Sequence, residues 1–352
     1  MAHAIDRPVT IKDVAAHAAV SVATVSAVLN ANKYVSPALE QRVRASIAAL
    51  GYERNSLAQS LKKQTSLTIG LVISDITNPF FTSVVRGVED VANQHNYSLI
   101  LGNTDEDLEK EKNYVHLLES KRLDGLILAA TAGSHEYLQS LPAQKLRLVT
   151  LDRSLFEWGI DSVLIDNVAG ARKAVGHLIQ LGHRRIGIVT GISGITTTRE
   201  RLIGYKTALE AHNIALDATL IAEADSRIEG GRRAALQLLT QENTRPTALF
   251  AMNGLMAIGI LQTLEELGLR CPEDIALVSF DDFAWSSILR PRLTVVRQPT
   301  YEIGQKAAHL LFERLKKRDA PPQEVRLQPQ LIIRESCGIG LQKTLLNPGL
   351  NN

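Results

Sequence analysis

Cysteine is scarce in this sequence, and long apolar runs are absent. Cys271 and Cys337 are the two cysteines in 352 residues, too few for a disulfide framework, so we expect reduced thiols. No apolar run reaches the roughly 18 to 20 residues that a membrane-spanning helix needs. Residues 1–8 contain no apolar segment typical of a secretion signal. The sequence therefore favours a cytoplasmic protein with no membrane partner.

Motifs of the common catalytic and metal sites are also missing. The nine histidines form no HExxH motif and the cysteines form no CxxC pair, so we expect no metal and no cofactor. Residues 191–194 (Gly-Ile-Ser-Gly) match neither the GxGxxG nor the GxxxxGK spacing of nucleotide-binding loops. We therefore expect that the chain is not an enzyme. The alternative to a regulatory protein is a protein that binds or modifies sugars and has no regulatory role.

The N-terminal segment carries the pattern of three short helices. Thr10 and Ser21 are placed to cap a first helix and a second helix over residues 22–29, and Ser36 precedes a third helix that Gly51 ends. Apolar residues at helical spacing can close one small core: Val14, Ala18, Val25, Val28, Leu29, Val43, Ile47 and Leu50. Two short helices joined by a tight turn, with a third behind them, are typical of helix-turn-helix DNA-binding domains.

Positive charge is concentrated in the same part of the chain. Residues 1–66 hold eight Lys and Arg residues against four Asp and Glu residues, a net charge of +4. Subtracting these from the totals of 39 and 37 leaves 31 basic against 33 acidic residues, or −2. Binding to phosphates requires such a positive excess, so the distribution supports double-stranded DNA as a partner.

A candidate hinge follows the three helices. Residues 52–63 can form one or two helical turns that expose Leu61 beside Lys62 and Lys63. A helix this short is marginal alone in water, so we expect it to fold only against a partner. Leucine can open a base step in a DNA minor groove while lysine contacts phosphate. A plain linker is the alternative.

From residue 67 onward, apolar strands alternate with amphipathic helices. The expected strands are residues 67–73, 98–101, 125–128, 147–151, 162–165, 185–189, 248–251 and 275–280. Near-continuous apolar runs of this kind are typical of parallel strands buried on both faces. Helices are expected between them, over residues 81–94, 108–121, 199–212, 229–241 and 256–268. The pattern predicts an α/β fold with two doubly wound parallel sheets and a ligand cleft between them.

Polar residues stand at the ends of several of these strands, where ligands of such folds bind. They include Asp152 and Arg153 after the fourth strand, Asp281 after the last, and Arg201 in a following helix. A single residue of this kind is more often a loop cap or a surface ion pair, but several converge on one cleft here. Aspartate accepts hydrogen bonds from sugar hydroxyls, and the arginine fork donates to hydroxyls or to a carboxylate. A small sugar or sugar acid is therefore the expected ligand.

Several motifs of the chain resemble the lac-repressor (LacI/GalR) family. The headpiece motifs, in the family's order, are Thr-Ile-Lys-Asp-Val-Ala, Val-Ser-x-x-Thr-Val-Ser, Val-Ser-Pro, Leu-Gly-Tyr and Asn-Ser-Leu-Ala-Gln-Ser-Leu. The remaining chain is similar to that family's sugar-sensing core and to periplasmic ribose-binding proteins, through residues 78–81, 151–153, 199–205, 280–281 and 298–299. The likeness covers roughly residues 9 to 340.

The resemblance implies a division of the chain and a set of site residues. The segments are a helix-turn-helix domain (1–54), a hinge helix and linker (55–66), an effector-binding core (67–340) and a short tail (341–352). The core subdomains are about 67–166 with 298–325, and about 167–297 with 326–340. The implied DNA-binding residues are Thr10, Ser21, Val22, Ala23, Thr24, Ala27, Asn30, Asn55, Ser56, Ala58, Leu61 and Lys62. The implied effector-binding residues are Asn78, Phe80, Phe81, Asp152, Arg153, Arg201, Asn253, Asp281 and Gln298.

The chain departs from the family pattern at several positions. Ala19 replaces a glycine common in the turn, which costs about 1 kcal/mol if the backbone is left-handed there. Ala27 stands where many members have Arg or His, so contact with thymine methyls and DNA shape carry more of the base recognition. Gly254 replaces the usual Asp, and residues 224–227 lack the usual aromatic side chain, which argues against a purine effector.

Together these features predict a sequence-specific DNA-binding transcriptional regulator. The resemblance implies a repressor of carbohydrate-metabolism genes that binds a pseudo-palindromic operator as a homodimer. Closure of the cleft on the effector would then bias the hinge helices between ordered and disordered states. Residues 341–349 are too short for the roughly three or four heptads of a stable coiled coil, so we expect a dimer rather than a tetramer.

Overall fold

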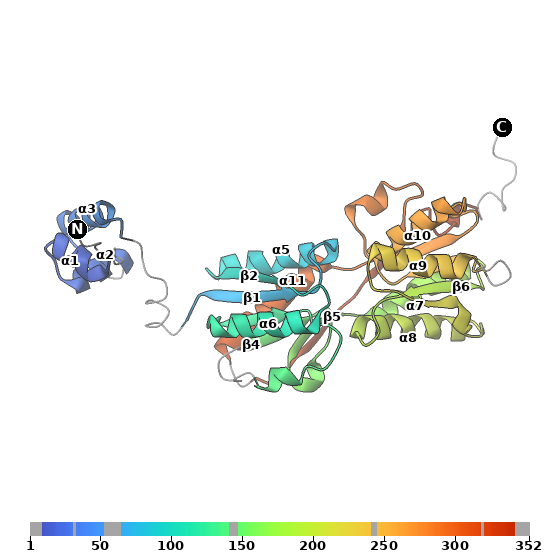
Figure 1. Ribbon diagram of the computed structural model, residues 1–352, viewed down its shortest axis with the longest axis horizontal. Coiled ribbons are helices and arrows are strands. Elements are labelled where there is room, and N and C mark those ends of the chain that lie inside the picture. The colour runs from blue at the N-terminus through green and yellow to red at the C-terminus, as the bar shows by residue number, and fades with distance from the viewer. Residues whose placement is uncertain are drawn as a thin grey trace, which may run out of the picture. The chain divides into compact units, whose positions relative to one another are not determined.

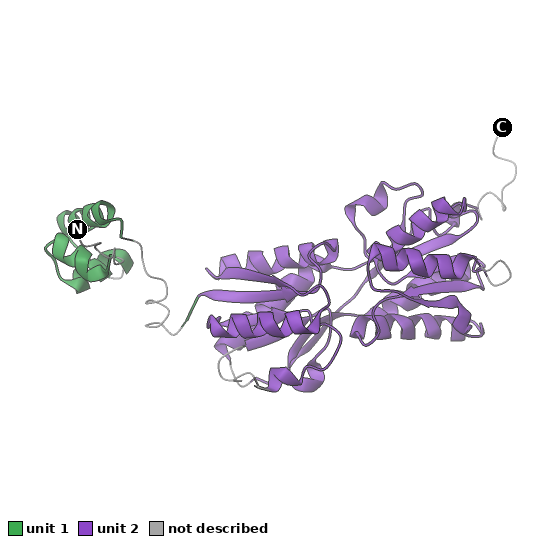
Figure 2. Cartoon of the chain, viewed as in Figure 1, with its two compact units in different colours: residues 1–66 green, residues 67–352 purple. Residues whose placement is uncertain are grey.

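The computed structural model describes residues 9–30, 33–52, 65–140, 147–240, 245–317 and 320–341. The chain divides into two compact units, residues 1–66 and residues 67–352 (Figure 2). Among the described residues, no single helix combines the length and the apolar character of a membrane span. Helices α1 (Ile11–His17) and α2 (Val22–Asn30) meet that test only jointly, across a bend of 108°.

In its described residues the first unit contains three helices, α1, α2 and α3 (Pro37–Leu50). The Asp13 carboxylate accepts hydrogen bonds from the Thr10 backbone N–H (2.8 Å) and hydroxyl (2.7 Å), which fastens the first turn of α1. The Ser21 hydroxyl accepts a hydrogen bond from the Thr24 backbone N–H (3.1 Å) at the start of α2. The apolar faces of the helices close a core of Val14, Ala15, Ala18, Val25, Val28 and Val43.

The turn between α1 and α2 has a left-handed residue, Ala19, with φ of 49°. Arg42 of α3 donates hydrogen bonds from Nη2 to the carbonyl oxygens of Ala18 (2.5 Å) and Ala19 (3.0 Å). A left-handed alanine costs about 1 kcal/mol relative to its preferred conformations. The turn is therefore held by a contact from α3 as well as by its own sequence.

Two six-stranded sheets form the second unit (Figure 1). The first sheet is parallel and has the order β11 (Glu324–Leu327), β5 (Asp161–Ile165), β4 (Arg147–Leu151), β3 (Gly125–Leu128), β1 (Thr68–Ile73), β2 (Ser98–Asn103). The second has the order β12 (Gln330–Ile332), β10 (Thr294–Arg297), β9 (Ala276–Phe280), β8 (Ala248–Ala251), β6 (Ile186–Thr190), β7 (Ile221–Glu223). Its edge strand β12 is antiparallel to β10, and its other pairings are parallel. The predicted α/β fold with two doubly wound sheets is confirmed.

Four of these strands were not expected from the sequence: β7, β10, β11 and β12. Three of them lie at sheet edges, where a strand is covered on fewer sides and needs no continuous apolar run. In β11, for example, fully and partly exposed residues alternate. The fourth, β10, lies inside the sheet, but Thr294 and Arg297 limit its apolar run to two valines.

Helices cover both faces of the first sheet. Helices α5 (Pro79–Gln94) and α11 (Thr300–Lys316) pack with Ile69 and Leu71 of β1 in one apolar cluster. Helix α6 (Leu108–Ser120) packs with Val72 in another. Alternate residues of a strand point to opposite faces, so these clusters lie on opposite sides of the sheet.

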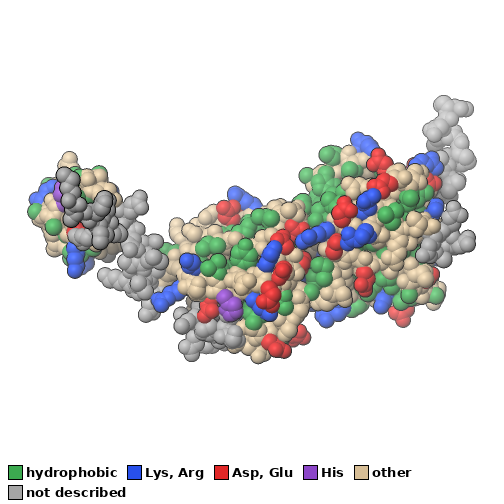
Figure 3. Space-filling view, in the orientation of Figure 1, with side chains coloured by type: hydrophobic (Ala, Val, Ile, Leu, Met, Phe, Trp, Pro, Cys, Tyr) green, Lys and Arg blue, Asp and Glu red, His purple; other side chains and the backbone are tan. Residues whose placement is uncertain are grey.

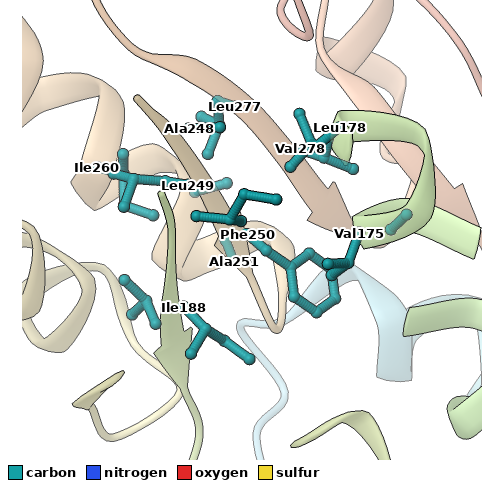
Figure 4. Close-up of a cluster of buried hydrophobic side chains, with 14 of the residues drawn as sticks. Val175, Leu178, Ile188, Ala248, Leu249, Phe250, Ala251, Ile260, Leu277 and Val278 are labelled. Atoms are coloured by element: carbon teal, nitrogen blue, oxygen red, sulfur yellow. The ribbon is translucent and has the colours of Figure 1, made fainter. Parts of the chain in front are cut away.

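The second sheet is covered in the same way by four helices. They are α7 (Asn167–Gln180), α8 (Thr196–Glu210), α9 (Ile228–Leu239) and α10 (Gly254–Glu266). Figure 4 shows successive residues of β8 pointing to opposite faces, Phe250 towards Val175 of α7 and Leu249 towards Ile260 of α10. All four side chains are fully buried, so the sheet is the centre of this subdomain.

The two sheets with their helices define a first subdomain (β1–β5, β11) and a second subdomain (β6–β10, β12). Within the described residues, the chain passes between them after β5, after β10 and after β11. The carboxyl ends of β4 and β9 therefore carry residues from different subdomains to one region. This crossing pattern positions the candidate site.

Candidate ligand-binding site

A polar cavity with about 610 Å³ of empty space, part of it open to solvent, lies between the two subdomains. Side chains from both subdomains line it. The nine residues expected to contact an effector all belong to its lining: Asn78, Phe80, Phe81, Asp152, Arg153, Arg201, Asn253, Asp281 and Gln298. The structure thus brings together residues that are up to 220 positions apart (298 minus 78) in the sequence.

Two aspartates occupy equivalent positions in the two subdomains. Asp152 directly follows β4 and Asp281 directly follows β9, and both have left-handed backbones, with φ of 64° and 73°. Both side chains are largely buried, and this burial raises the pKa of each carboxyl group above its ordinary value. The neighbouring guanidinium groups of Arg153 and Arg201 act in the opposite direction. Each carboxylate therefore depends on nearby hydrogen-bond donors and positive charges.

Protein donors already orient the Asp281 carboxylate. Its Oδ1 accepts a hydrogen bond from Nε2 of Gln298 (2.6 Å), and its Oδ2 accepts one from the backbone N–H of Gly254 (3.2 Å). A Cβ at Gly254 would lie 2.5 Å from the ring of Phe283, so no larger residue fits there without rearrangement. Gly254 is therefore covered by the Phe283 ring.

Arg201 of α8 is buried and held on three sides. Its Nε donates to Oδ1 of Asn167 (2.8 Å), its Nη1 donates to the carbonyl oxygen of Met252, and its guanidinium lies 3.9 Å from the ring centroid of Phe280. Burial lowers the pKa of Arg201, and Asp281 and Asp152 partly offset that shift. The side chain is rigid, which suits it to donate to a ligand in one orientation.

Arg153 forms a bidentate ion pair with Glu106. Its Nη1 donates to Oε2 of Glu106 (2.7 Å) and its Nη2 donates to Oε1 (2.5 Å), while Nη1 also donates to the carbonyl oxygen of Ala130 (2.6 Å). Burial disfavours the charged guanidinium, but Glu106 and Asp152 outweigh it and hold the pKa of Arg153 above its ordinary value. Arg153 therefore lines the cavity, but both terminal nitrogens of its guanidinium group already donate to acceptors within the protein.

The two asparagines of the site are also the N-cap residues of helices. Asn78 caps α5, where its Oδ1 accepts a hydrogen bond from the N–H of Phe80 (3.0 Å). Asn253 begins α10, where its Oδ1 accepts one from the N–H of Met256 (2.8 Å) and its Nδ2 donates to the carbonyl oxygen of Ser226 (2.8 Å). Both residues thus have a structural role as N-caps in addition to their place in the cavity lining.

Several residues that line the cavity were not expected from the sequence. They include Ser74, Glu106, Thr197, Asp225 and Arg227. Arg227 of the second subdomain donates from Nη2 to the carbonyl oxygen of Asp105 in the first (3.3 Å). On the face shown in Figure 3, charged side chains of both signs gather where the two subdomains meet. A signal for Glu106 existed, since it lies three residues after the last residue of β2, at the carboxyl edge of the sheet.

Comparisons with known proteins identify the family. Residues 10–55 match the family described as bacterial regulatory proteins, lacI family, and residues 175–337 match the periplasmic binding protein-like domain. The chain is 36% identical over 334 residues to the HTH-type transcriptional repressor PurR of Aliivibrio fischeri, which covers 93% of this chain and 98% of the relative. It is 37% identical over 329 residues to the ribose operon repressor of Halalkalibacterium halodurans, with coverage of 93% and 96%. The chain belongs to the lacI family of bacterial regulatory proteins.

A solved structure of the family agrees with the fold. The lac repressor dimer bound to operator and the anti-inducer ONPF superposes with a TM-score of 0.82 at 29% identity, covering 94% of this chain and 99% of that chain. The resemblance predicted from the sequence motifs is therefore confirmed. Because both relatives named above are transcriptional repressors, the expectation that the chain is not an enzyme is confirmed as well.

In the headpiece of this lacI-family member, α2 presents part of the expected DNA-binding face. Val22 and Ala23 are exposed, whereas Thr24 is partly buried. Ala27, one of the DNA-binding residues that the resemblance implies, is only 9% exposed, so it lies in the packed part of α2 and not on its outer face. Asn30 is exposed, and its Nδ2 donates to the carbonyl oxygen of Ser26 (2.7 Å).

The other expected DNA-binding residues divide into two groups. Thr10 and Ser21 are exposed at the starts of α1 and α2. The hinge residues Asn55, Ser56, Ala58, Leu61 and Lys62 lie outside the described residues. Burial of a short side chain such as Ala27 depends on the helices packed around it, which the residue pattern of α2 alone did not reveal.

Proposed function

We propose that the chain represses carbohydrate-metabolism genes and that a small sugar or sugar acid bound in the cavity controls its affinity for a pseudo-palindromic operator. The observation that carries this proposal is the cavity itself, lined from both subdomains by carboxylate, guanidinium, amide and aromatic groups. These groups suit a polyhydroxy ligand, because carboxylates accept from hydroxyls and arginines donate to them. The ribose operon repressor among the relatives supports a pentose-sized effector.

The proposed control works through closure of the two subdomains on the ligand. Asp152 and Phe80 approach the cavity from the first subdomain, and Arg201 and Asp281 approach it from the second. A ligand that bonds to both sides stabilises a closed arrangement over an open one by its difference in affinity. The first subdomain begins directly after residues 55–66, so its displacement is transmitted to the segment that carries the headpiece. We propose that this segment acts as the hinge.

The partners and location follow from the same proposal. The DNA-bound dimer of the lac repressor supports a homodimer in which two headpieces bind the two half-sites of the operator. Exposed Val22 and Ala23 on α2 are apolar and small, which suits contact with thymine methyl groups in the major groove. A regulator of this kind acts where the DNA is, so we propose a cytoplasmic location.

The proposal is tested with Arg201→Ala and Asp281→Ala in the full-length protein. A thermal-shift screen of sugars first identifies the effector, since a ligand at 100 times its dissociation constant adds about 2.7 kcal/mol of stability. Loss of one charge-assisted hydrogen bond costs about 1.5 to 3 kcal/mol, so each variant should bind that sugar roughly tenfold to a hundredfold more weakly in calorimetry. Arg199→Ala is the matched control, because Arg199 is exposed on the same helix and is absent from the cavity lining.

Operator binding by fluorescence anisotropy then tests the regulatory role. If the sugar is an inducer, both variants should keep the sugar-free operator affinity within a few-fold and lose the response to sugar. If it is a corepressor, both should remain weak on DNA at all sugar concentrations. Unchanged sugar affinity in both variants would show that the effector does not bind in this cavity.

A further inference from the structure

Glu106 occupies an unusual backbone position at the edge of the cavity. It and the preceding residue, Asp105, both have left-handed backbones, with φ of 63° and 54°. Such conformations cost of order 1 kcal/mol each outside glycine, and they persist where surrounding contacts hold them. The contact that holds Glu106 is its bidentate pair with Arg153, in which the two side chains are 14% and 9% exposed.

That ion pair occupies both terminal nitrogens of the Arg153 guanidinium group. Each terminal nitrogen of its guanidinium donates to a Glu106 oxygen, and each has a second acceptor, the Ala130 carbonyl oxygen for Nη1 and the Ser74 hydroxyl for Nη2 (3.3 Å). Nε lies 3.5 Å from Oδ2 of Asp152. Because a carboxylate or phosphate binds arginine through the same bidentate geometry, an anionic ligand would have to displace Glu106.

The charges around the cavity also oppose an anion. Among the described residues that line it, the acidic side chains outnumber the basic ones by five to three: Asp75, Glu106, Asp152, Asp225 and Asp281 against Arg153, Arg201 and Arg227. Arg201 has Nε and Nη1 committed to protein acceptors, as described above. With Glu106 paired to Arg153, a ligand anion would meet a surplus of carboxylates and no unoccupied fork at Arg153.

We propose that Glu106 sets the charge class of the effector, reserving the cavity for an uncharged polyhydroxy ligand and excluding sugar acids and sugar phosphates. This inference rests on the proposed function, and it narrows the effector from a sugar or sugar acid to a neutral sugar. Glu106 acts by filling the Arg153 fork that an anion would otherwise use. Removal of the Glu106 carboxylate is therefore expected to create a binding site for an anion, and not merely to weaken the binding of a neutral ligand.

The test compares matched neutral and acidic probes on the full-length protein. The probes are D-ribose with D-ribonate and D-ribose 5-phosphate, and D-glucose with D-gluconate, measured by thermal shift and calorimetry. Wild type should bind a neutral sugar at least about tenfold more tightly than its acid. Glu106→Gln keeps the size of the side chain but frees Arg153, and it should bind at least one acid roughly tenfold to a hundredfold more tightly than wild type does.

Glu109→Gln is the matched control, because it removes the same charge from an exposed side chain that pairs with Lys112 on α6, outside the cavity lining. It should leave the preference for neutral sugars unchanged. The role of Glu106 is overturned if wild type binds an acid as tightly as its neutral partner, or if folded Glu106→Gln gains no acid binding. If Glu106→Gln does not fold, the wild-type comparison still tests the proposed charge class of the effector, and equally tight binding of an acid and its neutral partner would overturn it. If no neutral sugar binds wild type, the proposed sugar effector is wrong, while a gain of acid binding in Glu106→Gln would still support the role of Glu106.

Discussion

At the scale of single residues, left-handed backbones mark the edge of the cavity. Asp105, Glu106, Asp152 and Asp281 all have positive φ, and each lies at or just beyond the carboxyl end of a strand. A residue with positive φ turns the chain, so its side chain points in a different direction from the one it would have if the strand continued. The strain is of order 1 kcal/mol per residue. The side chains of Glu106, Asp152 and Asp281 line the cavity, whereas Asp105 forms an ion pair with Lys110.

Ala19 shows the same conformation with no ligand to explain it. Replacing Ala19 with Gly should raise the free energy of unfolding of the first unit by about 1 kcal/mol, because glycine adopts φ of 49° without a steric penalty. Urea unfolding followed by circular dichroism measures the difference. The Arg42 hydrogen bonds to Ala18 and Ala19 use backbone carbonyl oxygens, so the substitution leaves them in place.

Gly51 provides the reciprocal control for this prediction. Its φ is 59°, and a Cβ there would meet nothing within 4 Å, so Gly51→Ala changes only the backbone preference. It should lower the free energy of unfolding by about the amount that Ala19→Gly adds. Equal stability of Ala19→Gly and wild type would show that contacts from α3 already relieve the strain at Ala19.

At the scale of elements, α5 and α11 approach each other through two glycines. A Cβ at Gly87 of α5 would lie 2.2 Å from the carbonyl oxygen of Tyr301, and a Cβ at Gly304 of α11 would lie 2.1 Å from that of Val84. Backbone atoms cannot move aside as the end of a long side chain can. The two helices therefore pack backbone against backbone, and the helix that carries Phe80 and Phe81 is held firmly against the sheet.

Gly304→Ala should reduce stability for this reason. Adding one methyl group at a backbone contact forces the helices apart, which typically costs about 1 to 3 kcal/mol. Thermal and urea unfolding of the second unit measure the loss. In contrast, Gly176 of α7 has nothing within 4 Å of its Cβ position, so Gly176→Ala should add up to about 1 kcal/mol through helix propensity. A loss of stability in Gly176→Ala equal to that in Gly304→Ala would contradict the packing argument.

At the scale of the whole molecule, hydrogen bonds connect the cavity to both subdomains. Nε of Arg201 donates to Asn167, Nδ2 of Asn167 donates to Glu200 (2.9 Å), and Glu200 accepts from Nη1 of Arg326 on β11 in the first subdomain (2.8 Å). A ligand that shifts Arg201 therefore acts on a contact between the subdomains. Arg227 and the carbonyl oxygen of Asp105 form a second contact between the subdomains.

The proposed assembly is tested at this scale too. Light scattering of the full-length protein should give a mass of about twice the 38.5 kDa of one chain if the proposed homodimer forms. The measurement should be repeated over a range of protein concentrations and in the absence of DNA. A tetramer that persists under those conditions would contradict the dimer.

The sequence by itself determined the elements whose signals are local. Continuous apolar runs marked eight strands, including β1, β3 and β9, since strands buried on both faces must be apolar throughout. N-cap residues marked the starts of helices, and strand-end residues such as Asp152 and Asp281 marked the cavity, since parallel strands bring their carboxyl ends to one edge. Each of these signals is carried by a few consecutive residues, so each was readable without the fold.

Tertiary structure alone decided the features that depend on distant partners. The edge strands β7, β11 and β12 have no apolar run, because they are paired and covered on fewer sides. Ala27 is buried although Ala23, about one turn before it on α2, is exposed. Glu106 was missed because its role comes from Arg153, 47 residues away, whose fork it fills. Its position just after β2 was a local signal for the cavity edge, but its pairing with Arg153 has no local pattern, and only the folded chain brings the two side chains within hydrogen-bond distance.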